Sequence, residues 1–598
     1  MKTQTDIFIL EKNIYIKFLF YLLLIIFLRP DLILINNTPT GGDMGAHVVA
    51  VDFFTNNFFP NAKIFGWSNI WFAGFPLYYF YFPIPAIFVS FLLILFPFGI
   101  AFKLMVSFSI VLVVYSFEKL FRDRNENFNL LGYLCGLIFV LTESFTIYGG
   151  NLASTLAGQY SFTYSLAFGL LAYNYCEKED DTSSHIKASV FLALCLLSHL
   201  IPFILFSVIV FSKTITSRLS VIEKLIFFST FISLVSLWFI PMISNLSYTT
   251  DMGYTPFTNL SDLIKPDVYP FIILCFIFSI LCYRQLLSNS KLFFLSVYMF
   301  VLSTVLFFFI PPGALWNGRL IPFFNLGIII FFGLVLKIIF QKVNASDNYL
   351  RLFIAAGSLS TGFYLSNYFS LWNSNFSLTT YFFLFIVVIT YFILSLKDSL
   401  NSMILLLLTV GVFSTITYLP HWINWNFTGY EGKENWKDIT QLYDKLSELP
   451  PGRITWEASP DLNEYGTPMV LMTIPMFTDH TSMEGLYFDS SITTPFHFIS
   501  VSGLSEQPSN PVGGLRYYNG QFERGVYYLK QLGVDYFITY SDTKFQEALN
   551  SRNLDFIDKV SKFGIFSVNE SFLVETINKN IEIVRTPDGL SNILSSLL

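Results

Sequence analysis

The chain has 598 residues, of which 54% are hydrophobic and only 13% are charged. A soluble protein of this length needs far more charge on its surface, so the composition excludes a soluble enzyme and indicates a protein that crosses a membrane several times. The net charge is −6 and no basic patch is present, which gives no sign of a nucleic-acid partner.

Apolar runs that approach the length of a membrane-spanning helix, about 20 residues, recur over the first 420 residues. They fall near 15–35, 83–101, 104–118, 129–148, 152–175, 186–212, 221–244, 268–283, 292–310, 321–340, 349–369, 376–396 and 402–420. Two of them, 104–118 and 268–283, are short, whereas 186–212 is long and contains Pro202. The sequence therefore predicts about 11 to 14 transmembrane helices.

Basic residues in short loops predict the orientation of these helices, because cytoplasmic loops carry the excess of Lys and Arg. They mark as cytoplasmic the segments 213–224, 284–291, 342–351 and 397. The first loop, 36–82, and the tail after 420 then face outward. The basic cluster at 119–124 conflicts with simple alternation. A re-entrant or interfacial helix at 83–101, together with a helix break at Pro202, would resolve the conflict.

Neither a cleaved signal peptide nor a cysteine framework is predicted. The first apolar run follows Lys12 and Lys17, and no small-residue cleavage site comes after it, so we expect a retained helix. The five cysteines lie in or beside apolar segments without CxxC spacing, at Cys135, Cys176, Cys195, Cys275 and Cys282. They are typical of small core residues rather than of disulfides or a metal site.

The tail from about His421 to Leu598 differs from the rest because its charge density rises. Short β-like runs, "RITWEA", "VDYFITY", "GIFSV" and "IEIVR", alternate with the amphipathic segments "WKDITQLYDKLSEL" and "SDTKFQEALNSRN". We therefore predict a membrane domain over 1–420 and an extracytoplasmic soluble α+β domain over 421–598.

The stretch "NNTPTGGDMGAH" follows directly on the first predicted helix and contains an acid at the expected membrane surface. Gly41 and Gly42 give a flexible approach, and Asp43 is placed to cap a helix that begins at Met44. His47, four residues on, shares a helix face with Asp43. A carboxylate here could accept a proton from an incoming hydroxyl. The alternative is that Asp43 is only a helix cap and His47 a surface residue.

Aromatic residues and prolines fill the remainder of this loop, in "GWSNIWFAGFPLYYFYFPIPAIF". Trp and Tyr at this density suit a membrane interface or a sugar-stacking surface.

The order of these features resembles the plan of the GT-C membrane glycosyltransferases, in which an acid in the first outer loop is followed by many helices and then by an outer domain. More narrowly, "GGDMGAH", "GFPLYYFYFP", "AGQYSFTYSLAFGLL", "LSHLIPF" and "LWNGRLIPF", in this order, look like a bacterial and archaeal membrane family labelled "6-pyruvoyl-tetrahydropterin synthase-related". Nothing in the chain resembles a pterin enzyme.

This resemblance implies a polyprenyl-phosphate sugar as donor and Asp43 as the general base. The acceptor hydroxyl would attack the anomeric carbon with inversion while the polyprenyl phosphate leaves. The leaving phosphate needs positive charge nearby, and Arg319, in a predicted outer loop, is the first candidate. The alternative for Arg319 is a side chain that snorkels at the membrane boundary.

Further polar residues lie within apolar runs and could line the substrate site together with His47. His199 precedes Pro202 in "LCLLSHLIPF", and a neutral His at a capped helix end is the alternative. Gln159 and Tyr160 in "AGQYSFTY", and Glu143 in "LTESF", could line the same site or form hydrogen bonds between helices.

Two clusters of polar residues could bind a ligand, one a metal ion and the other a carbohydrate. Asp43, His47 and Asp52 could bind a divalent cation, but the nine-residue offset turns Asp52 about 180° away from Asp43 on one helix, so we predict no metal site. In the tail, "FTDHTSMEGLYFDSSITTPFHF" gathers His480, Glu484, Tyr487, Asp489 and His497. We expect this segment to cover the membrane part, with carbohydrate binding as the alternative.

We therefore predict a multi-pass plasma-membrane glycosyltransferase that uses a polyprenyl-phosphate sugar and an extracytoplasmic glycan, lipid or protein acceptor. A transporter or flippase of lipid-linked or small solutes is the first alternative, although no internal repeat supports it. A non-catalytic protein of envelope assembly is the second.

Overall fold

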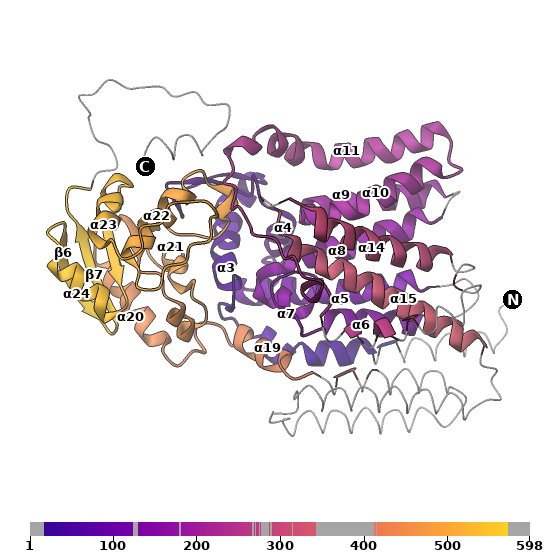
Figure 1. The fold of residues 1–598 in the computed structure, drawn as a ribbon, viewed down its shortest axis with the longest axis horizontal. Helices are drawn as coiled ribbons and strands as arrows, with labels where there is room; N and C mark the ends of the chain where they lie inside the picture. The colour runs from indigo at the N-terminus through magenta and orange to yellow at the C-terminus, as the bar shows by residue number, and fades with distance from the viewer. Residues whose placement is uncertain are drawn as a thin grey trace.

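The computed structural model describes residues 17–122, 129–265, 290–342 and 416–571, with gaps at 19, 179–180, 312 and 314, and with scattered residues between 268 and 286 and between 409 and 413. A bundle of apolar helices forms one part of the molecule, and an α/β region built from the C-terminal residues lies at one end of it (Figure 1). Helix α3 lies between the two parts (Figure 1).

The bundle contains helices of very different length. Its elements are α2 (Pro30–Ile33), α3 (Met44–Phe53), the π-helix η1 (Phe54–Phe58), η2 (Phe59–Asn61), α4 (Ile84–Leu92), α5 (Phe98–Leu120), α6 (Asn129–Val140), α7 (Leu152–Ser154), the π-helix η3 (Thr155–Gln159), α8 (Tyr160–Cys176), α9 (Thr182–Ser198), α10 (Leu200–Thr216), α11 (Val221–Ser244), η4 (Leu246–Tyr248), α12 (Leu260–Leu263), α14 (Ser290–Phe309), η6 (Asn317–Leu320) and α15 (Ile321–Lys342). A small hairpin of β1 (Gly66–Ser68) and β2 (Phe75–Leu77) lies in the first loop.

Within the described residues, four helices are long and apolar enough to cross a membrane: Phe98–Leu120, Val221–Ser244, Lys291–Phe309 and Asn317–Ile338. Shorter apolar helices accompany them at Asn129–Val140, Thr182–Ser198 and Leu200–Thr216. The chain is a polytopic helical membrane protein, as its composition predicts.

The predicted run 129–148 is helical only to Val140, and two other predicted helix boundaries are wrong for a local cause. The run 83–101 is not one helix: α4 ends at Leu92, and α5 begins at Phe98 after Pro97, whose extended backbone (ψ 160°) starts a new helix. The long run 186–212 does break, but at His199 rather than at Pro202. His199 has an extended backbone, and Pro202 lies in the first turn of α10, where a proline is tolerated.

Several predictions fall outside the described residues. These are the runs 349–369 and 376–396, most of 268–283 and 402–420, the strand "IEIVR" and Cys282. The other four cysteines are buried, as expected of small core residues.

The C-terminal region combines a mixed sheet with short helices. Its elements are α19 (Leu419–Phe427), α20 (Trp436–Ser447), β3 (Arg453–Trp456), η7 (Pro460–Tyr465), η8 (Val470–Thr473), α21 (Ile474–Phe477), β4 (Thr481–Ser482), η9 (Phe488–Ser490), α22 (Thr494–Leu504), α23 (Phe522–Gln531), β5 (Tyr536–Thr539), α24 (Asp542–Asn550), β6 (Leu554–Val560) and β7 (Phe563–Val568). The strand order is β4-β3-β5-β7-β6, with β4, β3 and β5 parallel and β7 antiparallel to both β5 and β6. The sequence predicts β3, β5, β7, α20 and α24, but misses β4 and β6.

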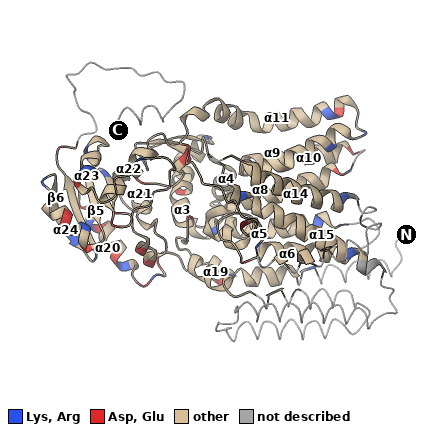
Figure 2. Cartoon of the chain, in the orientation of Figure 1, with Lys and Arg blue, Asp and Glu red and all other residues tan. Residues whose placement is uncertain are grey.

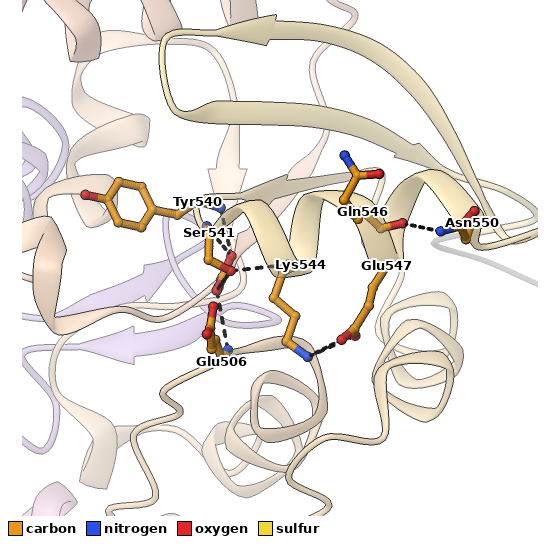
Figure 3. Close-up of polar contacts among 8 residues, drawn as sticks. Glu506, Tyr540, Ser541, Lys544, Gln546, Glu547 and Asn550 are labelled. Carbon is orange, nitrogen blue, oxygen red and sulfur yellow. Dashed lines mark hydrogen bonds and ion pairs between the residues drawn. The ribbon is translucent and has the colours of Figure 1, made fainter.

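The carboxyl ends of β3 and β5 are where such sheets often bind anionic ligands, because the chain leaves β3 towards β4 on one side and β5 on the other. Here the buried Glu457 carboxylate fills this position. It accepts hydrogen bonds from the backbone N–H groups of Tyr540 (2.8 Å) and Ser541 (2.9 Å) and from the Ser541 hydroxyl (2.7 Å). The backbone N–H of Glu506 donates to the same carboxylate (Figure 3). The backbone N–H groups at this position are therefore bound by the protein's own side chain.

Glu143 joins the bundle to the C-terminal region. Its carboxylate accepts the backbone N–H groups of Thr417 (3.1 Å), Tyr418 (2.8 Å) and Leu419 (2.8 Å), as well as the Thr417 hydroxyl (3.1 Å). These groups form the N-terminus of α19, where a negative charge is stabilised by the helix dipole. Glu143 therefore bonds between segments, as one of its two sequence interpretations predicts.

Candidate functional site

The segment from Gly41 to Asp43 lies between the bundle and the C-terminal region and leads into α3. Gly41 and Gly42 have left-handed backbones (φ 98° and 53°), which glycine adopts without strain. The Asp43 N–H donates to the carbonyl of Ala157 in η3 (3.0 Å). Helix α3 begins at Met44, as the sequence predicts.

The Asp43 side chain does not cap α3, although Asp43 occupies the N-cap position. The carboxyl group is densely surrounded by protein but remains partly exposed to solvent. Burial raises the pKa of Asp43 to about 6, while the Arg319 guanidinium acts in the opposite direction. A partly exposed carboxylate with this pKa is suited to accept a proton near neutral pH.

Arg319, in η6 at the start of α15, supplies positive charge near Asp43. Its Nη1 donates to the side-chain oxygen of Gln159 (2.6 Å) and to the carbonyl of Ile147 (2.6 Å). No hydrogen-bond partner is found for Nη2 and Nε within the described parts of the chain, and the side chain is partly exposed. These donors can therefore meet an anionic ligand.

His47 is not a surface residue, because only 2% of it is exposed. Its Nδ1 lies 3.0 Å from the Tyr487 hydroxyl, which comes from the C-terminal region. Burial lowers the pKa of His47 to about 3, so the ring is neutral. Tyr160, with 2% exposure, packs edge-on to His47 at 5.0 Å between ring centroids. Both residues support the site from behind rather than face solvent.

Gly158 permits the close approach of η3 to α3. A Cβ atom at this position would lie 2.8 Å from the Cβ of Asp43 and 3.0 Å from Cδ2 of His47, and φ is +108°. Only glycine combines this backbone with this spacing. The π-helical turn Thr155–Gln159 therefore places Gly158 against Asp43 and Gln159 against Arg319.

His199 caps a helix, as one of its two sequence interpretations predicts. Its Nδ1 accepts the N–H of Ile201 (3.2 Å) and caps α10. The ring stacks on Phe82 at 4.7 Å, remains partly exposed, and lies within electrostatic range of Arg319. The structure thus brings His199, Arg319 and Asp43 into one neighbourhood.

Tyr81, which sequence reasoning did not single out, and Asp489, which it placed in the tail cluster, join this neighbourhood. Tyr81 lies close to both Arg319 and Asp43, and its ring stacks on Tyr487 at 3.9 Å between centroids. Asp489 is exposed and lies within electrostatic range of Arg319. The aromatic content of "YYFYFP" indicates a functional loop, but no spacing rule selects Tyr81 within it.

The predicted tail cluster divides into residues with different surroundings. His480 binds the carbonyl of Leu446 through Nε2 (2.7 Å) and is structural. His497 is fully buried, and its Nε2 lies 3.8 Å from a Glu484 carboxylate oxygen. Tyr487 and Asp489 reach the neighbourhood of Asp43 and Arg319, so this part of the segment covers the bundle, as predicted.

Asp52 lies away from Asp43 at the far end of α3, where its carboxylate accepts a hydrogen bond from Asn56 (3.1 Å). His47 is engaged by Tyr487. Within the described ranges, no group of three or more His, Cys, Asp or Glu side chains is arranged to hold a metal ion.

Comparisons with known proteins return structural similarities of low score. ArnT from Cupriavidus metallidurans, in the apo state, has a TM-score of 0.49 and 15% identity over 92% of this chain and 98% of its own. The archaeal oligosaccharyltransferase AglB from Archaeoglobus fulgidus scores 0.41 with 12% identity over 88% of this chain and 69% of its own. The arabinofuranosyltransferase AftD from Mycobacteria scores 0.47 with 12% identity over 92% and 41%. The chain matches no protein-family model and no curated protein.

Proposed function

We propose that the protein is a membrane glycosyltransferase that transfers a sugar from a polyprenyl-phosphate donor to an extracytoplasmic acceptor. Asp43 is the general base and Arg319 stabilises the leaving phosphate. The observation that carries this proposal is the pairing of a partly exposed, uncapped Asp43 carboxylate with the partly exposed Arg319 guanidinium at the junction of the bundle and the C-terminal region. The resemblance of the chain's overall plan to that of GT-C enzymes agrees with it.

The two charges fit the two ends of such a reaction. The acceptor oxygen forms a bond to the anomeric carbon, and its proton passes to Asp43. The bond between that carbon and the donor phosphate oxygen breaks, and the electron pair leaves with the phosphate. Nη2 and Nε of Arg319 are donors for the charge that develops there. The product has inverted configuration because the acceptor attacks from the face opposite the phosphate.

The neighbouring residues support these roles without taking part in proton transfer. Gln159 holds Nη1 of Arg319 and so orients the other donors towards the ligand. Tyr81 and His199 offer partly exposed rings beside the charged pair, which suits contact with a sugar or with the lipid phosphate.

The charge distribution supports an outward-facing site. Lys and Arg gather at the helix ends remote from the C-terminal region (Figure 2), with Lys213 in the last turn of α10 and Lys291 in the first turn of α14. Cytoplasmic ends of membrane helices carry such an excess. The opposite end, where Asp43 and the C-terminal region lie, is then extracytoplasmic.

Mass spectrometry of cell-surface glycans tests the proposal in the native host. Deletion of the gene should remove a defined sugar from one surface glycan, glycolipid or glycoprotein, and the wild-type gene should restore it. The Asp43→Asn variant, inserted in the membrane at wild-type level, should not restore it. Restoration by Asp43→Asn would contradict the assigned base. A deletion that changes only the sidedness of a lipid-linked sugar would instead indicate a flippase.

A further inference from the structure

The peptide group that joins Gly42 to Asp43 is held from both sides by different parts of the chain. Its carbonyl oxygen, on Gly42, accepts a 2.6 Å hydrogen bond from the Thr467 hydroxyl in the C-terminal region. Its N–H, on Asp43, donates a 3.0 Å hydrogen bond to Ala157 in the bundle. Because a peptide group is planar and rigid, two bonds at opposite edges fix its rotation.

Further contacts bring the C-terminal region against the same segment. The Tyr430 N–H donates to the Thr38 carbonyl (3.0 Å), and the Thr40 N–H donates to the Asn426 carbonyl (3.1 Å). The Thr467 side chain is fully buried, and its methyl group lies against Gly45. Thr467 thus stands within a packed interface, and of these contacts from the C-terminal region it is the one made to the peptide group that carries Asp43.

The orientation of this peptide matters because no capping hydrogen bond holds the Asp43 carboxylate in place. The side chain makes no capping bond, and the two preceding residues, Gly41 and Gly42, resist backbone rotation less than other residues do. The direction of the Asp43 Cα–Cβ bond is therefore set by the backbone on which it stands. A displacement of about 1 Å in a reacting group can reduce a rate by about a hundredfold.

We propose that Thr467 is a positioning residue, through which the C-terminal region sets the orientation of the Asp43 carboxylate. The assignment rests on the proposed function, because it takes Asp43 as the base. Thr467 touches neither donor nor acceptor: it acts through the Gly42 carbonyl. The docked C-terminal region is thus part of the machinery that aligns the site, and not only a cover over it.

Three purified variants test the assignment in a sugar-transfer assay with the donor that the wild-type protein uses. Thr467→Val removes the hydroxyl at nearly constant volume and should lower kcat about tenfold or more, with donor KM within about twofold. Thr467→Ser keeps the hydroxyl and should retain at least about a third of the wild-type kcat. Thr440→Val is the matched control, since its hydroxyl bonds only the Lys437 carbonyl of its own helix (2.9 Å), and it should behave as wild type.

A second readout does not depend on catalysis. Asp43→Cys provides a thiol at position 43, and the rate at which a membrane-impermeant maleimide labels this thiol reports its exposure. Adding Thr467→Val should change the labelling rate about threefold or more, whereas adding Thr467→Ser should leave it within about twofold. If the valine variant does not fold, Thr467→Ala removes the same hydroxyl and takes its place in both assays.

The two proposals fail in different ways. Full activity of Asp43→Asn removes the proposed base, and the labelling rates still decide whether Thr467 orients position 43. An inactive Asp43→Asn with an unchanged kcat in folded Thr467→Val leaves the base in place and overturns the positioning role. Equal losses in Thr467→Val and Thr467→Ser also overturn it, because the hydroxyl would then not be responsible.

Discussion

Nη1 of Arg319 donates a 2.6 Å hydrogen bond to the side-chain oxygen of Gln159. The partner is a neutral amide, which fixes the orientation of the guanidinium without cancelling its charge. A carboxylate in the same place would orient the arginine equally well but would compete with an anionic ligand. The pairing therefore suits a residue that must remain attractive to a phosphate.

Replacing Gln159 should weaken phosphate binding without removing the arginine. Gln159→Ala should lower the affinity for undecaprenyl phosphate about five- to tenfold, which corresponds to about 1–1.4 kcal/mol, the net contribution of one hydrogen bond. Native mass spectrometry of the detergent-solubilised protein measures this. Gln546→Ala, on α24 of the C-terminal region, is the control, because the Gln546 amide points away from the contacts in Figure 3. Equal binding by the Gln159 and Gln546 variants would count against the orienting role.

Activity should depend on pH through the ionisation of Asp43. Because burial raises its pKa to about 6, the carboxylate is mostly protonated at pH 5 and mostly ionised at pH 7. A base must be ionised to accept a proton, so kcat/KM should rise with pH through about 6 and level off above about 7. Initial rates across this range measure the midpoint. A flat profile between about pH 5 and 7 would show that Asp43 does not titrate as the base.

Gly158→Ala should damage the site through both backbone and packing. The left-handed φ of 108° alone is expected to cost about 1–3 kcal/mol for a residue with a side chain. The added Cβ also collides with Asp43 and His47, so activity should fall more than stability does. Gly520→Ala is the matched control, because φ is +76° there but no atom lies within 4 Å of the added Cβ. Melting temperatures and transfer rates of both variants are compared. Similar loss of activity in both would remove the case for a collision at Asp43.

Glu143→Gln should loosen the start of α19 without touching the site directly. The amide can accept fewer of the four hydrogen bonds and carries no charge for the helix N-terminus, so unfolding should become easier by about 1–3 kcal/mol. Thermal unfolding in detergent gives the size of the change. Glu434→Gln, at an exposed position of the C-terminal region, should leave the melting temperature nearly unchanged.

Local patterns predicted much of the fold where hydropathy and capping agree. Helix α11 is found at Val221–Ser244, as predicted, because the apolar run begins directly after a capping box formed by Ser220 and Glu223. Hydropathy misplaced the start of α5, since Leu92 to Phe96 are as apolar as the helices on either side. There the proline at 97, not the hydropathy, sets the boundary.

The candidate site could be predicted only in part. Asp43, Arg319 and His199 stand out because charged or ionisable residues beside apolar runs are unusual, and the structure brings them together. The contact of His47 with Tyr487 spans 440 residues, and that of Thr467 with Gly42 spans 425. No local spacing rule reaches so far, so the part of the C-terminal region in the site becomes visible only in three dimensions.

Sugar transfer by purified Asp43→Asn, compared with purified Asp52→Asn, tests the central claim most directly. The two variants neutralise acids on or beside the same helix, but the Asp52 carboxylate is bound to Asn56 and lies away from the charged pair. Transfer from a polyprenyl-phosphate sugar should fall at least about a hundredfold in Asp43→Asn and stay within about twofold of wild type in Asp52→Asn. Wild-type turnover by a folded Asp43→Asn variant would contradict the account.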